Sequence, residues 1–154
     1  PGVVKPGSRN SEIVSNLDFA QTFLDIAGVK SPDDMQGGSL VPLFKGHVPK
    51  HWRTHFYYHY YEFPGAHSVA RHYGVTNGRH KLIHFYQNNE WELFDLKKDP
   101  NELQSVYGNS DYKTIQSDLL AELKRLRVHY KVPEEDPVPP KRKRPNQPNR
   151  PKKK

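Results

Sequence analysis

A regular series of short aromatic segments and turn signals in the middle of the chain most constrains its fold. Residues 55–61 read HFYYHYY, an alternation that suits a β-strand with aromatic cross-strand pairs. Three further segments of strand length follow, at 70–76, 79–86 and 90–96. Asn77-Gly78, between the second and the third, is a strong two-residue hairpin signal. Because the connections are short, these segments predict an antiparallel sheet of about four strands.

One long helix is predicted to cover this sheet. Apolar side chains at spacings of three and four residues form a single stripe on residues 111–131: Ile115, Leu119, Leu123, Leu126 and Tyr130. Ser110 or Asp111 is expected to cap the helix, and Val132-Pro133 to stop it. Burying each of these side chains is worth roughly 1.5–3 kcal/mol, which indicates a structural role for the helix. We therefore expect an α+β unit.

A second, amphipathic helix is predicted near the start of the chain, over residues 16–27. Its apolar residues define one face that is suited to burial: Leu17, Ala20, Phe23, Leu24 and Ala27. Ser15 or Asn16 is expected to cap this helix, with Asp18 in the first turn, where a negative charge is favourable. Gly28 is then expected to end it.

Several ordered strings resemble one enzyme family. VSNLDFAQTFLDIAG, then a PDDMQG turn and SLVPLFKG, are similar to the late segment of a sulfatase catalytic domain. Farther along, HFYYHYYE, RHYGVTNGRHKLIHFY and WELFDLKKDPNE resemble the C-terminal subdomain of bacterial sulfatases. Together the strings cover about residues 1–131. The resemblance places the parent protein among formylglycine-dependent sulfatases, closest to those that hydrolyse sulfated carbohydrates such as N-acetylglucosamine 6-sulfate.

The resemblance implies a division of the chain into three parts. Residues 1–50 would be the tail end of an alkaline-phosphatase-like α/β sulfatase domain. Residues 51–132 would be the C-terminal subdomain, in which the four-stranded antiparallel sheet packs on the long helix. Residues 133–154 would be a disordered, basic, proline-rich tail. For an enzyme of this family the resemblance also implies a periplasmic or secreted location.

The charge of the last segment sets it apart from the rest. Residues 133–154 carry eight Lys and Arg against three acidic residues, a net charge of +5 within a total of +7. Such a sequence cannot bury enough apolar surface to offset its ordering entropy. We expect it to be solvated, with a weak electrostatic contact to a polyanion as its most plausible sharper role. Nucleic acid is not expected as a partner, because no folded nucleic-acid motif accompanies the basic run. No apolar run is long enough to span a bilayer.

The groups that carry out sulfatase chemistry are not found in this sequence. The family modifies a Cys or Ser of a [C/S]-x-[P/A]-x-R motif to formylglycine and binds Ca²⁺ through acidic and amide oxygens. Residues 1–154 contain no cysteine, no such motif and no S-D-[NH]-G calcium motif. The resemblance therefore implies that formylglycine and Ca²⁺ belong to a part of the parent enzyme upstream of Pro1. No catalytic residue is predicted in this chain.

Histidine pairs four residues apart do not predict a metal site here. His55/His59 and His80/His84 both fall in expected strands, where four residues span roughly 13 Å. Two imidazoles at that separation cannot share one zinc ion, whose bonds to nitrogen are near 2.1 Å.

Three residues beside the first long loop, EFPGAHS at 62–68, are candidates for substrate binding: His67, Arg71 and His72. An Arg fork with imidazole donors suits sulfate oxygens or sugar hydroxyls. In related sulfatases the C-terminal subdomain leans over the cleft and supplies substrate-selecting residues. The alternative is that Arg71 and His72 are ordinary strand residues in surface hydrogen bonds. His59 and Glu62 are weaker candidates.

Two other interpretations of the chain remain open. It could be a free-standing module that recognises glycan or nucleic acid, or a nonfunctional remnant of a truncated gene. The apolar face of residues 16–27 argues against the free-standing module, because that face suits packing on a large sheet outside this sequence.

Overall fold

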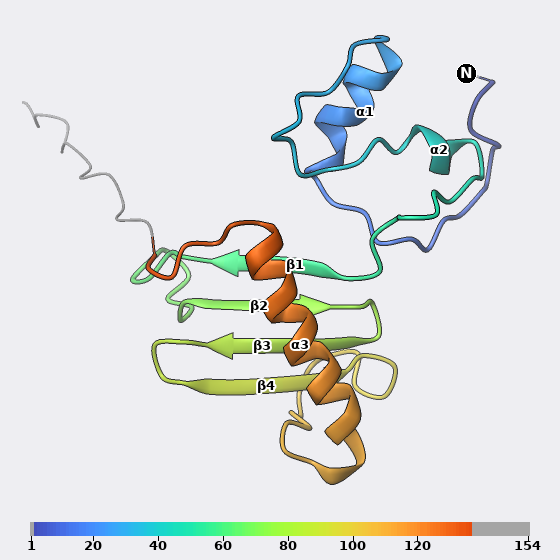
Figure 1. Ribbon diagram of the computed structural model, residues 1–154. Coiled ribbons are helices and arrows are strands. Elements are labelled where there is room, and N and C mark those ends of the chain that lie inside the picture. Colours follow the sequence, from blue (N-terminus) through green and yellow to red (C-terminus); the bar gives the residue numbers. More distant parts are fainter. Residues whose placement is uncertain (1, 137–154) are drawn as a thin grey trace, which may run out of the picture.

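The computed structural model describes residues 2–136, which form two parts joined by the single segment between α2 and β1 (Figure 1). The N-terminal part holds two short helices, α1 (Asp18–Ile26) and α2 (Val41–Phe44). The second part is a four-stranded sheet with the long helix α3 (Lys113–His129) lying across one face. The predicted α+β architecture is therefore confirmed. No helix in the described range is long and apolar enough to cross a membrane.

The sheet is an antiparallel meander in the order β1-β2-β3-β4. Each strand agrees with its predicted segment to within two residues, because alternating side chains and turn residues both point to the same boundaries. The strands are β1 (Phe56–Tyr60), β2 (His72–Thr76), β3 (His80–Phe85) and β4 (Glu90–Asp95).

The hairpin between β2 and β3 is centred one residue later than predicted. Thr76 pairs with Lys81, and the Asn77 N–H donates to the His80 carbonyl at 3.1 Å. The central pair is therefore Gly78-Arg79, and Gly78 has a φ of +85°. A turn of this kind needs glycine at its first central position, whereas a turn centred on Asn77-Gly78 would need both residues left-handed. The Asn77 side chain instead accepts from the backbone N–H of Arg79 and of His80.

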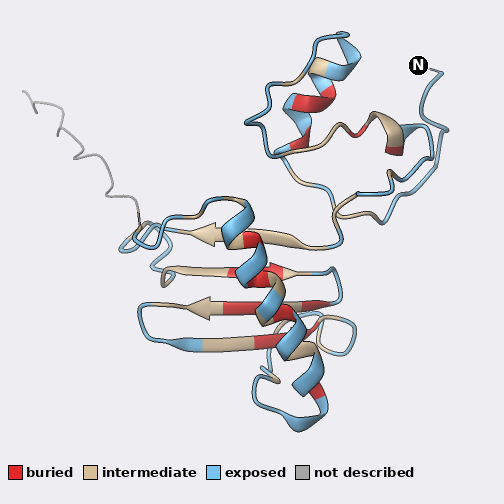
Figure 2. Ribbon diagram, in the orientation of Figure 1, coloured by how far each residue is buried: buried red, intermediate tan, exposed pale blue. Residues whose placement is uncertain are grey.

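The core lies between the sheet and α3 (Figure 2). Of the predicted stripe, Leu119, Leu123 and Leu126 are buried, and Ile115 and Tyr130 pack at the edge of the cluster. These side chains meet buried residues from three strands and from the turn before the helix: Val75, Leu82, Leu93 and Tyr112.

The ends of α3 differ slightly from the prediction. A 3₁₀ turn, η1 (Ser110–Tyr112), precedes the helix, and the Asn109 side chain accepts from the Asp111 N–H at 2.9 Å. The predicted cap was therefore wrong by one or two residues, because Asn109 has the extended backbone that a capping side chain requires. The helix ends at His129, and Lys131 adopts a left-handed φ of 51° just before Val132-Pro133.

Helix α1 buries its polar side rather than its apolar side within this chain. Asp18, Gln21 and Thr22 are buried, whereas Phe23 and Ile26 are 69% and 67% exposed. Thr22 donates to the Asp18 carbonyl and accepts from the Leu40 N–H, which ties the helix to the segment before α2. The apolar face predicted for burial is therefore left open by the residues that the structure describes.

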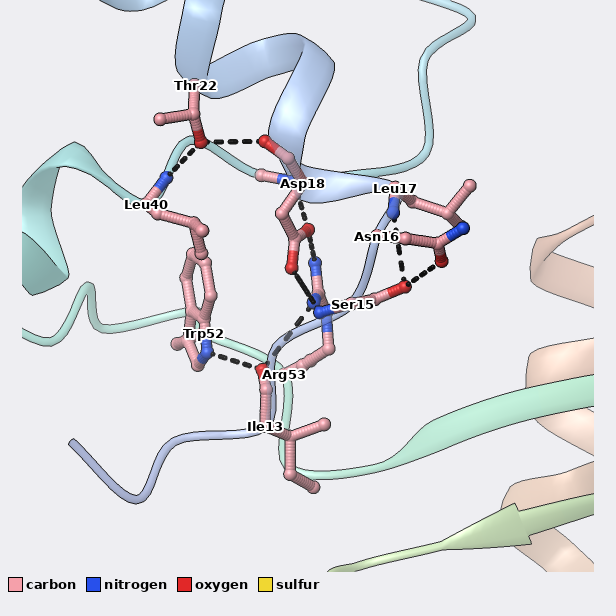
Figure 3. Close-up of polar contacts among 10 residues, drawn as sticks. Ile13, Ser15, Asn16, Leu17, Asp18, Thr22, Leu40, Trp52 and Arg53 are labelled. Atoms are coloured by element: carbon pink, nitrogen blue, oxygen red, sulfur yellow. Dashed lines mark hydrogen bonds and ion pairs between the residues drawn. The ribbon is translucent and has the colours of Figure 1, made fainter.

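A buried ion pair connects α1 to the segment that leads into the sheet (Figure 3). Both terminal nitrogens of Arg53 donate to the carboxylate of Asp18, which also accepts from the backbone N–H of Ser15 and of Gly38. Burial opposes the charge of Asp18, but these donors outweigh it and keep the pKa of the carboxyl below its usual value. The predicted cap is confirmed at Ser15, whose Oγ accepts from the Leu17 N–H at 3.3 Å while the Asp18 carboxylate accepts from the Ser15 N–H in return.

Candidate functional site

One of the three predicted residues, Arg71, lies where β1, β2 and β3 meet the segment that follows α3. Residues 61–71 connect β1 to β2 and are largely exposed. Arg71 stands at the end of this loop, and its Nη2 donates to the Phe63 carbonyl at 2.9 Å. This bond fixes the guanidinium group at the base of the loop.

Arg71 also forms an ion pair with Asp136, which comes after the end of α3. Its Nη1 lies 3.2 Å from Asp136 Oδ2. The hydroxyl of Tyr86, just past the end of β3, donates to the same oxygen at 2.6 Å. Burial and then the hydrogen bond to Asp136 raise the pKa of Tyr86 well above its usual value, so the phenol keeps its proton. Two donors separated along the chain therefore converge on one carboxylate.

His59 supports this arrangement from β1. Its Nδ1 lies 3.1 Å from the Tyr57 hydroxyl, and its Nε2 lies 3.4 Å from the Tyr86 hydroxyl. Because Tyr86 gives its proton to Asp136, every contact is satisfied when His59 donates from Nε2 and accepts at Nδ1. A neutral imidazole thus orients the Tyr86 hydroxyl toward the carboxylate. We name Arg71, Tyr86 and His59 the anion cradle.

His72 points away from the anion cradle. It follows Arg71 directly and alternates with Tyr73, which packs against the core under α3, so its side chain lies on the other face of the sheet. There its ring stacks on Tyr60, with centroids 5.5 Å apart, and contacts Phe85 at 5.2 Å. Its Nδ1 donates to the Ala70 carbonyl at 2.8 Å.

The three predicted residues therefore share one loop but do not form one cluster. His67 is exposed in the middle of the loop, Arg71 belongs to the anion cradle, and His72 belongs to the opposite face. Tyr86 and Asp136 were missed by the sequence analysis. An aromatic residue at a strand end and an acidic residue in a charged tail carry no pattern that distinguishes them from their neighbours.

Acid is expected to weaken the fold through His59. Burial lowers the pKa of His59 to about 4, and the charge of Asp136 offsets only part of this change. A histidine whose pKa falls on folding contributes stability that is fully present above its unfolded pKa of 6.5 and is lost as the pH falls toward 4. The imidazole resonances of His59 in an NMR titration should have a midpoint near 4. In urea unfolding, His59→Gln should lose less stability than the wild type between pH 6.5 and 4. An NMR titration midpoint near 6.5 for His59 would contradict a pKa lowered by burial.

The sequence contains no [C/S]-x-[P/A]-x-R motif that could be modified to formylglycine. Among residues 2–136, no group of three His, Cys, Asp or Glu side chains is placed to hold a metal ion. The site offers a set of hydrogen-bond donors for one anionic group.

The sequence of this chain is similar to those of several known proteins. Residues 1–129 match the family described as N-sulphoglucosamine sulphohydrolase, C-terminal. The chain is 47% identical over 134 residues to an N-acetylglucosamine-6-O-sulfatase of Bacteroides thetaiotaomicron, covering 85% of this chain and 24% of that protein. It is 33% identical over 112 residues to an arylsulfatase of Clostridium perfringens, covering 71% of this chain and 21% of that protein.

A solved structure is similar over the same region. It is the structure of BT4656 in complex with its substrate D-glucosamine-2-N, 6-O-disulfate, with a TM-score of 0.82 and 45% identity. The match covers 86% of this chain and 27% of that one. The chain therefore spans about a quarter of the length of the relatives it matches.

Proposed function

The chain belongs to the sulfatases, as the C-terminal region of that family, and on this premise we propose that it is part of an enzyme that hydrolyses sulfate esters of carbohydrates. The observation that carries the proposal is the 47% identity to an N-acetylglucosamine-6-O-sulfatase over 85% of the chain. The identity to the arylsulfatase is lower and extends over less of the chain, which favours a sugar substrate over a simple aryl ester.

The proposed substrate class is a glucosamine derivative that carries a sulfate ester. Support comes from BT4656, whose structure was solved with its substrate D-glucosamine-2-N, 6-O-disulfate and is 45% identical to this chain over the matched region. Formylglycine and Ca²⁺ would be supplied by another part of the enzyme, since this sequence lacks the formylglycine motif and the part that the structure describes holds no metal-binding cluster.

The proposed role of residues 51–132 is to help select the substrate. His67 is exposed in the loop between β1 and β2, where a ligand can reach it, and Arg71 stands beside this loop with 24% of its side chain exposed. His72 would contribute from the opposite face of β2. Residues 1–50 would form the last part of the catalytic domain, and the exposed apolar face of α1 would pack against the rest of that domain.

Two further proposals follow from the family and the charge. A periplasmic or secreted location fits an enzyme that meets sulfated glycans. The predicted contact of the basic tail with polyanions concerns residues that, from 137 on, lie outside the described part of the chain.

Kinetics of the enzyme that contains this chain can test the substrate-selecting role. His67→Ala, His72→Ala and Arg71→Met are each expected to lower kcat/KM for N-acetylglucosamine 6-sulfate about 10-fold, because each loses one hydrogen bond to the sugar itself. The same variants should leave kcat/KM for a small aryl sulfate nearly unchanged, because that substrate lacks the sugar. Equal losses on both substrates would mean that these residues do not select the sugar.

A further inference from the structure

The strongest unassigned feature of the molecule is the anion cradle around Asp136. The carboxylate of Asp136 accepts from Arg71 and Tyr86, and its Oδ1 lies 3.6 Å from His59 Nε2. The three cradle residues come from the strand β1, from the start of β2 and from the end of β3, so the sheet itself fixes their spacing. The cradle is therefore a property of the folded sheet, and the carboxylate is brought to it by a separate segment.

The segment that delivers the carboxylate has little else to hold it. Pro133, Glu134 and Glu135 are exposed, whereas Asp136 is partly buried, with 18% of its side chain exposed. Its burial comes through the contacts to the cradle. The Arg71–Asp136 pair is partly buried, with 24% of the Arg71 side chain and 18% of the Asp136 side chain exposed, so a dissolved oxyanion can reach the same donors and replace the carboxylate.

The cradle has donor capacity that Asp136 does not use. Arg71 Nε is buried and has no hydrogen-bond partner among the residues that the structure describes. Its Nη2 is held by the Phe63 carbonyl, so the orientation of the guanidinium group does not depend on Asp136. A planar carboxylate or a tetrahedral sulfate could accept from Arg71 and from Tyr86 at the same time.

We propose that Arg71 and Tyr86, oriented by His59, form a binding site for one oxyanion, a carboxylate or a sulfate, and that Asp136 is an internal occupant that competes with such a ligand. Arg71 is shared with the proposed substrate-selecting role, so the identification of the ligand as a sulfated sugar rests on the proposed function. The existence of the anion site does not. The C-terminal segment would then regulate access to Arg71.

Calorimetric titration of the full chain with sodium sulfate, at constant low ionic strength, tests the site directly. Asp136→Ala should bind sulfate at least about tenfold more tightly than the wild type, since a charge-assisted contact no longer has to be displaced. Glu135→Ala is the matched control, because it removes the same charge from the neighbouring exposed position. It should bind sulfate as the wild type does.

Two further variants complete the test. Arg71→Met in the Asp136→Ala background should abolish the gain, and Asp136→Asn should show a smaller gain while keeping the shape of the side chain. Circular dichroism verifies that each variant is folded. If Asp136→Ala is unfolded, the sulfate titration of Asp136→Asn is used in its place. Unchanged sulfate affinity in the folded Asp136 variants, or an equal gain in Glu135→Ala, would overturn the proposal.

Sugar ligands separate the cradle from the proposed function. N-acetylglucosamine 6-sulfate and glucuronate present a sulfate and a carboxylate, and uncharged N-acetylglucosamine should not bind at the cradle. Tighter binding of inorganic sulfate and of glucuronate but not of the sugar sulfate would support the anion site while contradicting the sulfated sugar as its ligand. Tighter binding of the sugar sulfate would support both.

Discussion

Replacing Arg53 with methionine is expected to destabilise the N-terminal part of the chain by about 3–5 kcal/mol, because it leaves the carboxylate of Asp18 buried without its ion partner. The ordinary cost of cutting an exposed pair is far smaller. Asp18 is fully buried and Arg53 is 18% exposed, so solvent cannot replace the lost contact. Trp52 reports this unfolding, since its ring lies beside Arg53 and its indole N–H donates to the Ile13 carbonyl.

The measurement is urea unfolding followed by Trp52 fluorescence in a Trp91→Phe background. Asp33→Asn is the control, because its ion pair with Lys30 is almost fully exposed and its loss should change the free energy of unfolding by less than about 0.5 kcal/mol. Combining Arg53→Met with Asp18→Asn should cost less than the sum of the two single changes. Additive losses, or an effect as small as that of Asp33→Asn, would refute a stabilising buried pair.

Truncating Leu119 to alanine is expected to destabilise the sheet and α3 by about 2–5 kcal/mol. Leu119 is 2% exposed and lies in the cluster with Val75, Leu82 and Leu93, so its removal leaves a cavity between the helix and the sheet. Trp91 packs against this cluster and reports its unfolding. In a Trp52→Phe background, the urea midpoint should fall strongly for Leu119→Ala.

Val128→Ala is the matched control on the same helix, because Val128 is 74% exposed. It should change the free energy of unfolding by less than about 0.5 kcal/mol. The two tryptophans also separate the two parts of the molecule: Leu119→Ala should leave the Trp52 transition in place, and Arg53→Met should leave the Trp91 transition in place. Equal losses of unfolding free energy for Leu119→Ala and Val128→Ala would contradict the packing of Leu119 in the core.

Much of the sheet and of α3 could be predicted because their signals are local. Alternating aromatic residues and turn residues predicted the strands. One apolar stripe predicted the buried face of α3, and Leu119, Leu123 and Leu126 lie in the core as expected. The turn was predicted at Asn77-Gly78 and lies one residue later, at Gly78-Arg79. The Asn-Gly pattern indicates a tight turn but does not determine which two residues are central. The Asn109 cap was missed for a similar reason, since several polar residues there can cap a helix.

The long-range polar contacts could not be predicted, because no periodicity encodes them. Asp18 was interpreted as an acid in the first turn of a helix, yet its partner Arg53 lies 35 residues away. Arg71 was recognised as a candidate from its chemistry, whereas its contact with Asp136 joins residues 65 apart. The folded sheet brings the residues of the anion cradle together from separate strands. The sequence alone therefore did not predict the cradle.

Sulfate release from N-acetylglucosamine 6-sulfate, measured side by side for residues 1–154 and for the proposed larger enzyme that contains them, tests the central claim most directly. We expect the larger protein to release sulfate and residues 1–154 alone to release none, because this sequence lacks the formylglycine motif and its described residues hold no metal-binding cluster. Turnover by residues 1–154 alone would contradict the assignment of the chemistry to another part of the enzyme. A larger protein that turns over no sulfate ester would contradict the enzyme itself and favour a binding module or a gene remnant.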